Sequence, residues 1–415
     1  MSAELISILV LVAVFAIATT RSVNMGALSF TAAFAVGTLV AGLDAEGIFA
    51  GFPGDLFVVL VGVTYLFALA RANGTTDWLV HGAVRLVGGR VALIPWMMFA
   101  VTGLLTAIGA VSPAAVAIVA PIALGFASRY QISPLLMGVM VVHGAQGGGF
   151  SPISVYGAIV NGIVDKEDLP GSPIVLFLAS LLVNLVIAAI LFVLCGGLKL
   201  PRHVAAKDEA ADPERDALNP ARITTLFALA ALVVAVLGFN LDAGLTAITL
   251  AAALSVVWPK SSRDAVGQIT WPTVLLICGV LTYVAVLEQM GTIDYAGTSV
   301  SQIGVPLLGA LLICYIGALV SAFASSVGIM GALIPLAIPF LALGDIGAIG
   351  MVTALAISST VVDVSPFSTN GALVLASAAE VDRERFFRQL MIYGGIVVAA
   401  VPPIVWLALV VPGFG

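Results

Sequence analysis

Hydroxyl and amide side chains gather at two matching interruptions of apolar segments, where their types and spacing suit the binding of a small anion and a cation. SPISVYGAIV occupies 151–160, and SPFSTNGALV occupies 365–374. When the chain is aligned with itself so that position 151 falls on 365, six of these ten positions are identical. Hydroxyl and amide groups can donate hydrogen bonds to a carboxylate and offer oxygen atoms to a hard cation. The repeated segment therefore marks a candidate binding site.

Four long apolar stretches carry such interruptions. AVSP at 110–113 divides 91–128, ASSVG at 324–328 divides 305–343, GAQGGGFSP at 144–152 divides 132–164, and VDVSP at 362–366 divides 346–379. Arms of about 15 residues reach only about 22 Å as helix, so the first two stretches are predicted to be re-entrant hairpins and the last two broken helices. Non-helical backbone within a bilayer is tolerated only against protein or a water-filled cavity, so each interruption points to a site.

A half-helix that starts inside the membrane presents unpaired N–H groups and about half a positive charge, which can bind a carboxylate. By this layout no Lys or Arg lies between the membrane faces, so helix N-termini must supply the positive field. The hydroxyl and amide groups placed at these interruptions are Ser112, Ser151, Ser154, Ser325, Ser326, Ser365, Ser368, Thr369 and Asn370. The alternative for each is a packing role, with the hydroxyl bonded to the preceding turn.

Two ionisable side chains lie close to the broken segments. Asp363 is placed deep in the membrane, where burial costs several kcal/mol unless it is compensated, and a role in cation coupling is predicted. The alternative is a helix-capping carboxylate that faces a hydrated crevice. His143 is either a proton relay or a packing residue with satisfied nitrogens. The glycines at 147–149 lack the spacing of a phosphate loop and leave room for a close backbone or ligand.

Composition requires lipid around the elements that position these residues. The chain has 415 residues, of which 61% are hydrophobic and 9% charged, against about 25% charged in an average soluble domain. An all-α integral membrane protein is therefore predicted. Further spans are expected near 5–18, 25–42, 56–72, 173–198, 221–238, 243–258, 271–289 and 388–412. Glu4 precedes the first apolar run and Arg21 follows it, which favours a retained span over a signal peptide.

Charge and cysteine content exclude other classes of protein. The net charge of −6 leaves no basic surface for nucleic acid. Cys195, Cys278 and Cys314 show no metal-binding spacing and are expected to be reduced packing residues.

The distribution of basic residues orients the spans. With ten crossings and two hairpins, fifteen of the 16 Lys and Arg residues fall on one side, and only Lys166 falls on the other. The positive-inside rule makes the crowded side cytoplasmic. A multi-pass protein of the cell (inner) membrane with both termini outside is predicted.

An internal repeat organises the chain. The alignment that places 151 on 365 also places Ser112 on Ser326 and Pro121 on Pro335. The predicted organisation is a first repeat at 1–198, a cytoplasmic linker at 199–222 and a second repeat at 223–415. Each repeat holds five transmembrane helices and one re-entrant hairpin, and an odd number of crossings inverts the second copy. Inverted repeats with discontinuous helices are typical of secondary transporters.

The chain resembles the ion transporter superfamily in three features, which are two inverted copies, a hairpin with a Ser-containing tip ten residues before a Pro, and a helix broken at SP. Within this superfamily it is most similar to divalent anion to sodium symporters and to bacterial malonate-type dicarboxylate carriers. The resemblance implies an elevator mechanism in a homodimer. It also implies that each hairpin tip, Ser-Asn-Thr in the family, holds a substrate carboxylate and helps to cage Na⁺. The matching tips here are Val111-Ser112-Pro113 and Ser325-Ser326-Val327, so neither tip keeps its Asn or its Thr.

The residue pattern and the resemblance together give two overlapping sets of site residues. Predicted to bind the small anionic substrate are Ser112, Pro113, Ser154, Ser325, Ser326, Ser368, Thr369 and Asn370. Predicted to serve Na⁺ or H⁺ coupling are Val111, Ser112, Gly148, Ser151, Ser326, Asp363 and Ser365. No organic cofactor is expected, and Na⁺ is the candidate coupling ion.

Three hypotheses for function follow. The first is a secondary carrier of small dicarboxylates such as malonate or succinate, coupled to Na⁺ or H⁺. The second is a cation or proton antiporter on the same scaffold, which Asp363 favours and the paired hydroxyl tips do not. The third, a membrane-embedded enzyme or receptor, is disfavoured because the sequence has no HExxH, GxSxG or paired catalytic carboxylates.

Overall fold

The described part of the chain is helical throughout its regular structure, as the composition predicts. The computed structural model describes residues 2–21, 23–86, 90–200, 218–292, 295, 306–322, 326–342, 346–378 and 382–414. Predictions for the linker centre and for Ser325 fall outside these residues.

Six helices in the described ranges are long and apolar enough to cross a membrane. They are α4 (Gly54–Ala72), α7 (Ser112–Tyr130), α10 (Pro173–Leu194), α12 (Pro220–Phe239), α15 (Trp271–Gln289) and the stretch Glu384–Val410, formed by α21 (Arg383–Val405) and η4 (Trp406–Val410). The structure is thus that of a multi-span membrane protein.

Shorter helices complete the bundle. Apolar ones are α1 (Ala3–Thr20), α2 (Met25–Leu39), α6 (Ile94–Ala107), α8 (Pro134–Gly148), α9 (Val155–Lys166), α13 (Ala243–Val257), α17 (Pro306–Ser321), α18 (Ser326–Ala342), α19 (Ala348–Val361) and α20 (Thr369–Ala376). Connecting ones are α3 (Ala45–Phe49), α5 (Thr75–Leu86), η1 (Val91–Leu93), η2 (Gly197–Lys199), α14 (Pro259–Ser262) and η3 (Val266–Gln268).

The second arm of the first hairpin is longer than expected. Arms of about 15 residues were predicted, and α6 has 14, but α7 has 19. It begins at Ser112 with Pro113 in its first turn, continues through Pro121, and ends at Tyr130, before the C-cap Gln131 with its left-handed φ of 53°. A helix of that length reaches about 28 Å, so length alone does not keep this arm from crossing.

Helices from the two halves of the chain interlock. α2 packs against α15, and α4 packs against α13. The same exchange occurs around the interruptions, where α7 contacts α20 and α9 contacts α18. Both halves therefore contribute to the surroundings of each interrupted segment.

Glycines set the close approach of α6 and α8. A Cβ added to Gly144 would collide with the carbonyl of Phe99, and one added to Gly148 would collide with the carbonyl of Gly103. Small residues at such crossings let helix backbones pack tightly within a membrane. At Gly148 the space left by the missing side chain is thus filled by the backbone of α6.

We expect Gly148→Ala to destabilise the protein, because the added methyl overlaps the α6 backbone. Overpacking of this kind costs about 1–3 kcal/mol, which should appear as a lower midpoint when detergent-solubilised protein is heated and its monodisperse fraction is followed. Gly125→Ala is the matched control, since a Cβ at this glycine within α7 meets nothing within 4 Å. Equal midpoints for the two variants would contradict the packing role.

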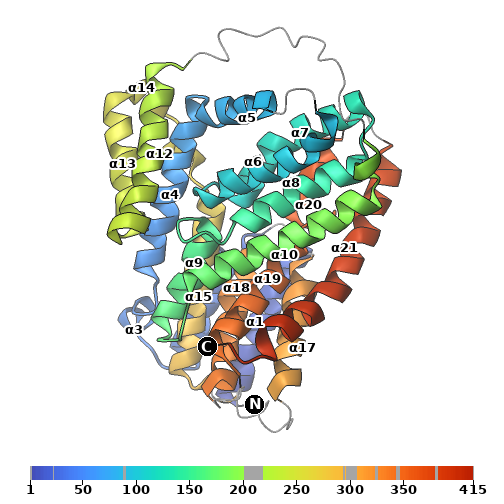
Figure 1. The fold of residues 1–415 in the computed structure, drawn as a ribbon. Helices are drawn as coiled ribbons and strands as arrows, with labels where there is room; N and C mark the ends of the chain where they lie inside the picture. Colours follow the sequence, from blue (N-terminus) through green and yellow to red (C-terminus); the bar gives the residue numbers. More distant parts are fainter. Residues whose placement is uncertain are drawn as a thin grey trace.

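Both termini lie at one end of the molecule, and α5 and α14 lie at the opposite end (Figure 1). This arrangement accords with the odd number of crossings predicted for each half. The charge distribution further predicts that α14 faces the cytoplasm, whereas the end of α9 faces outward. Cysteines introduced at the exposed positions Asp165 and Lys260 should react with a membrane-impermeant maleimide from opposite sides of a vesicle. Reaction of both from one side would contradict the topology.

Candidate functional site

The first break, between α8 and α9, is closed by a serine cap. Ser154 precedes α9, and its Oγ accepts a hydrogen bond of 3.1 Å from the backbone N–H of Gly157. The same hydroxyl contacts the carbonyl oxygens of Gly149 and Ser151. A Cβ at Gly157 would overlap the Ser151 carbonyl, so the turn requires glycine there. Ser154 therefore stabilises the start of the half-helix.

The second break, between α19 and α20, has the same turn. Ser368 Oγ accepts from the N–H of Gly371 at 3.4 Å and lies 2.7 Å from the carbonyl oxygens of both Asp363 and Ser365. Gly371 N–H donates to the Asp363 carbonyl at 3.0 Å, as Gly157 N–H does to the carbonyl of Gly149 in the first break at 3.2 Å. The sequence match between 151–160 and 365–374 thus corresponds to one shared backbone geometry.

Two further serines of the breaks also bond locally. The hydroxyl of Ser151 accepts from the N–H of Ile153 at 3.4 Å, and that of Ser365 accepts from the N–H of Phe367 at 3.3 Å. Both side chains are buried. In the described structure Ser151, Ser154, Ser365 and Ser368 therefore hold the turns, the structural alternative considered for them.

A buried polar cluster surrounds the Asp363 carboxylate. The side chain is 4% exposed, and Gln146 Nε2 of α8 donates to its Oδ2 at 3.0 Å. Asn370 Nδ2 lies 3.4 Å from the same oxygen and donates to Ser112 Oγ at 2.9 Å. Ser326 also interacts with the carboxyl group. The cluster joins the first hairpin tip to both broken helices.

Four helix N-termini face this cluster. Ser112 begins α7, Ser326 begins α18, and Tyr156 and Asn370 lie in the first turns of α9 and α20. Tyr156 is 4% exposed and interacts with both Ser112 and Asp363. Helix N-termini carry partial positive charge and unpaired N–H groups. Their meeting around one carboxylate provides a field suited to anions, although none of these cluster residues is Lys or Arg.

Two acceptor oxygens in the cluster are unused. The side-chain carbonyl oxygens of Gln146 and Asn370 are buried and have no hydrogen-bond partner within the described ranges. An unsatisfied buried polar atom costs about 1–3 kcal/mol. With the Asp363 carboxylate, these oxygens form a donor set of the type that binds hard cations. The described residues contain no group of three His, Cys, Asp or Glu side chains for a transition metal.

His143 is satisfied on both ring nitrogens. Nδ1 lies 2.7 Å from Asn184 Oδ1, and Nε2 lies 2.6 Å from the Tyr393 hydroxyl. Asn184 Nδ2 donates to the carbonyl of Ser180 at 2.9 Å, and Ser180 Oγ donates to the carbonyl of Gln146 at 3.2 Å. This chain ties α8 to α10 and α21, which favours the packing interpretation of His143 over the proton relay.

The remaining predicted residues of the first tip and of α20 lie near the cluster but differ in exposure. Val111 is 7% exposed and immediately precedes α7, and Pro113 is half-buried beside Ser112. Thr369 opens α20 but is exposed. In this conformation the Thr369 side chain is therefore not enclosed in a buried substrate site.

The second tip is described only in part. Ser326 is 2% exposed, and its hydroxyl accepts from Ser321 Oγ at 2.8 Å. Ser325 lies outside the described residues. The backbone carbonyl of Gly148 accepts from the N–H of Ser151 at 3.2 Å, within the turn that ends α8.

Gln146 and Tyr156 also belong to the cluster and were not predicted from the sequence. An amide in the apolar segment 132–164 was the available signal for Gln146, because buried polar groups in membranes require partners. Tyr156 occupies the position that matches Asn370 when 151–160 is aligned with 365–374. The repeat therefore carried a signal for the position of Tyr156 though not for its residue type.

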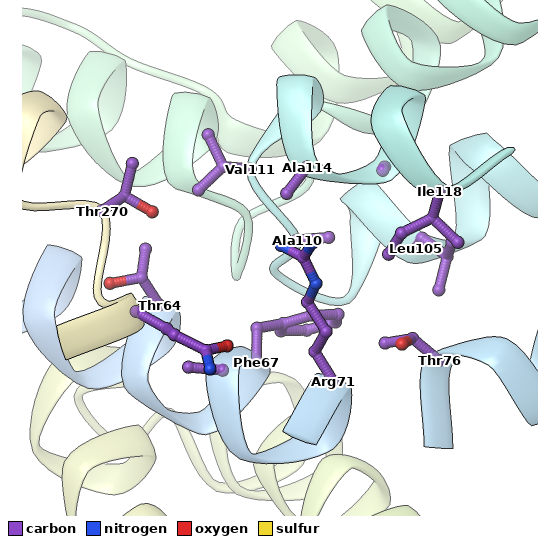
Figure 2. A pocket seen from close by; sticks show the side chains of 13 residues that line it. Thr64, Phe67, Arg71, Thr76, Leu105, Ala110, Val111, Ala114, Ile118 and Thr270 are labelled. Carbon is purple, nitrogen blue, oxygen red and sulfur yellow. The ribbon is translucent and has the colours of Figure 1, made fainter. Parts of the chain in front are cut away.

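A cavity adjoins the first hairpin tip. It spans about 470 Å³, a volume that includes space open to solvent. Figure 2 shows its walls. They comprise Thr64, Phe67, Ala68 and Arg71 of α4, Thr76 of α5, Leu105 of α6, the tip residues Ala110 and Val111, Ala114, Ala115 and Ile118 of α7, and Gln268 and Thr270 near α15. The Arg71 side chain extends toward Ala110 (Figure 2). A fixed cation at the end of α4 thus lies beside the tip.

Comparisons with known proteins agree with this architecture. Residues 1–149 match the family model described as the dicarboxylate carrier protein MatC N-terminus. The fold matches the crystal structure of the Alcanivorax borkumensis YdaH transporter with a TM-score of 0.59, over 88% of this chain and 89% of that chain, at 16% sequence identity. No curated protein matches the chain. Residues 1–149 are thus similar in sequence to the N-terminal part of a dicarboxylate carrier, and most of the chain shares the fold of the YdaH transporter.

Proposed function

We propose that this protein is a secondary active transporter of small dicarboxylates, of the size of malonate or succinate, coupled to Na⁺ or H⁺. The observation that carries the proposal is the buried cluster of Ser112, Gln146, Asp363 and Asn370 at the meeting of four helix N-termini. Hydroxyl and amide donors there suit a carboxylate, and the match of residues 1–149 to a dicarboxylate carrier supports that substrate class.

Asp363 supplies the reason for coupling. An ionised carboxylate repels an incoming dianion in a medium of low dielectric. Binding of a proton or of Na⁺ to its oxygens removes that repulsion. A bound Na⁺ is also coordinated by the unused side-chain oxygens of Gln146 and Asn370. Cation and substrate then bind best together, which is the thermodynamic requirement for symport.

Movement and assembly follow from the resemblance. We propose an elevator-type displacement of the hairpins and broken helices. The chain is organised as two inverted repeats and forms a homodimer within the lipid bilayer. The contacts of α7 with α20 and of α9 with α18 support the proposed displacement, because these packed helices carry Ser112, Asn370, Tyr156 and Ser326 around the cluster.

A cation or proton antiporter is the second candidate, and Asp363 is the observation that favours it. Such a protein needs a buried carboxylate but no anion-binding tip. The contact of 2.9 Å between Ser112 and Asn370 favours the symporter, because it places a hydrogen-bonding pair at the tip itself.

Uptake by reconstituted protein tests the proposal. Proteoliposomes should accumulate radiolabelled malonate or succinate when an inward Na⁺ or H⁺ gradient is applied, with the two gradients varied separately. Cation flux without dicarboxylate uptake under any gradient would instead support the antiporter. Acetate is the substrate control, since it offers only one carboxylate.

A further inference from the structure

We propose that the cavity beside the first hairpin tip is a second anion-binding site, a vestibule in which Arg71 binds one carboxylate of a dicarboxylate before the substrate reaches the cluster. The proposal rests on the proposed function for the identity of the substrate. It assigns a binding role to residues of α4, α5 and the segment before α15, none of which belongs to the cluster around Asp363.

The cavity has the chemistry of an anion site. Arg71 is exposed at the end of α4 and lines the cavity, and its guanidinium presents several N–H donors to a carboxylate. Gln268 and Thr270 add an amide and a hydroxyl from another wall. Thr64 is already satisfied, since its hydroxyl donates to the carbonyl of Leu60 at 2.6 Å.

Thr76 provides an independent indication of a missing ligand. Its side chain is 2% exposed and lines the cavity, yet its hydroxyl oxygen has no hydrogen-bond partner in the described part of the chain. Thr76 lies in the first turn of α5, where Asn73 Oδ1 accepts from the N–H of Thr75 at 3.1 Å. A carboxylate in the cavity would accept from the Thr76 hydroxyl and would lie near the positive end of this 12-residue helix.

The charges around the cavity favour an anion over a cation. Asp77 is the acidic residue of the first turn of α5, but it is exposed and does not line the cavity. Arg71 is the charged side chain among the residues that do line it.

The position of the cavity suits a site on the path of the substrate. Val111 lines the cavity, and Ser112, the next residue, receives the hydrogen bond from Asn370. The two sites therefore meet at adjacent residues of the hairpin tip. A dicarboxylate held by Arg71 at one end can present its other carboxylate to the tip.

Three variants test the vestibule. In Arg71→Gln the KM for malonate uptake should rise roughly tenfold at low ionic strength with little change in the maximal rate, because the lost contact is a hydrogen bond to a charged group. Arg71→Lys should retain most of the affinity, and Thr76→Val should raise KM by a smaller factor. Arg90→Gln is the matched control, since Arg90 is exposed and does not line the cavity.

Protection from labelling gives a readout that does not depend on transport. A cysteine introduced at Ala114, which lines the cavity, should be shielded by malonate from a maleimide, and Arg71→Gln should remove that protection while Arg90→Gln retains it. Unchanged KM and unchanged protection in Arg71→Gln would overturn the vestibule. Wild-type protein that is protected by malonate but takes up none would leave the vestibule standing and contradict the proposed function.

Discussion

Asp363→Asn should lower gradient-driven accumulation of dicarboxylate at least about tenfold, while the protein still folds and still exchanges substrate across the membrane. Asparagine keeps the size of the side chain and can still accept from Gln146 Nε2, which lies 3.0 Å from Asp363 Oδ2. It removes the charge that attracts Na⁺ or H⁺. A tenfold change in cation affinity corresponds to only about 1.4 kcal/mol, and the loss of a buried charge partner exceeds that value.

Three measurements separate the coupling of uptake to a cation gradient from the exchange of substrate across the membrane. Accumulation under a Na⁺ gradient, accumulation under a pH gradient, and exchange of labelled against unlabelled malonate should be measured on the same vesicles. Asp55→Asn is the matched control, because Asp55 is exposed in the first turn of α4 and lies outside the cluster. Accumulation by Asp363→Asn with wild-type dependence on both gradients would assign Asp363 to a structural role.

The interruptions of the helices could be predicted from sequence because they depend on local chemistry. The breaks at 149–154 and 362–368 overlap the interruptions predicted at 144–152 and 362–366, although 144–148 stays helical as the end of α8. The local bonds of Ser154 and Ser368 follow from the same rules, since serine is a preferred N-cap residue.

The partners within the cluster could not be predicted, because they depend on how helices from the two halves pack. Gln146 and Asp363 are 217 residues apart, and Ser112 and Asn370 are 258 apart. Neither contact follows from the local sequence around its residues. Arg71 is one of the fifteen basic residues that the charge count places on the cytoplasmic side, and no local pattern indicates that a cavity beside the tip extends to the end of α4.

Ser112→Ala is the second substitution expected to have a large effect. The Ser112 hydroxyl is 3% exposed, begins α7 and accepts from Asn370, so it lies where a substrate carboxylate would meet the tip. A lost hydrogen bond to a charged group costs about 1.5–3 kcal/mol, which should weaken the apparent affinity for malonate by roughly ten- to a hundredfold. Ser326→Ala, at the matching position of α18, should act in the same direction.

Ser29→Ala provides the control for this pair, because Ser29 is also a buried serine but donates only to the carbonyl of Met25 in its own helix, at 2.9 Å. Affinity should be measured by substrate competition during uptake, with malonate, succinate and acetate compared. If the two tips hold opposite ends of a dicarboxylate, each variant should lose affinity for malonate and succinate while acetate binds poorly throughout. Wild-type affinity in both Ser112→Ala and Ser326→Ala would make the tips packing elements, and the dicarboxylate assignment would then rest on the match of residues 1–149 alone.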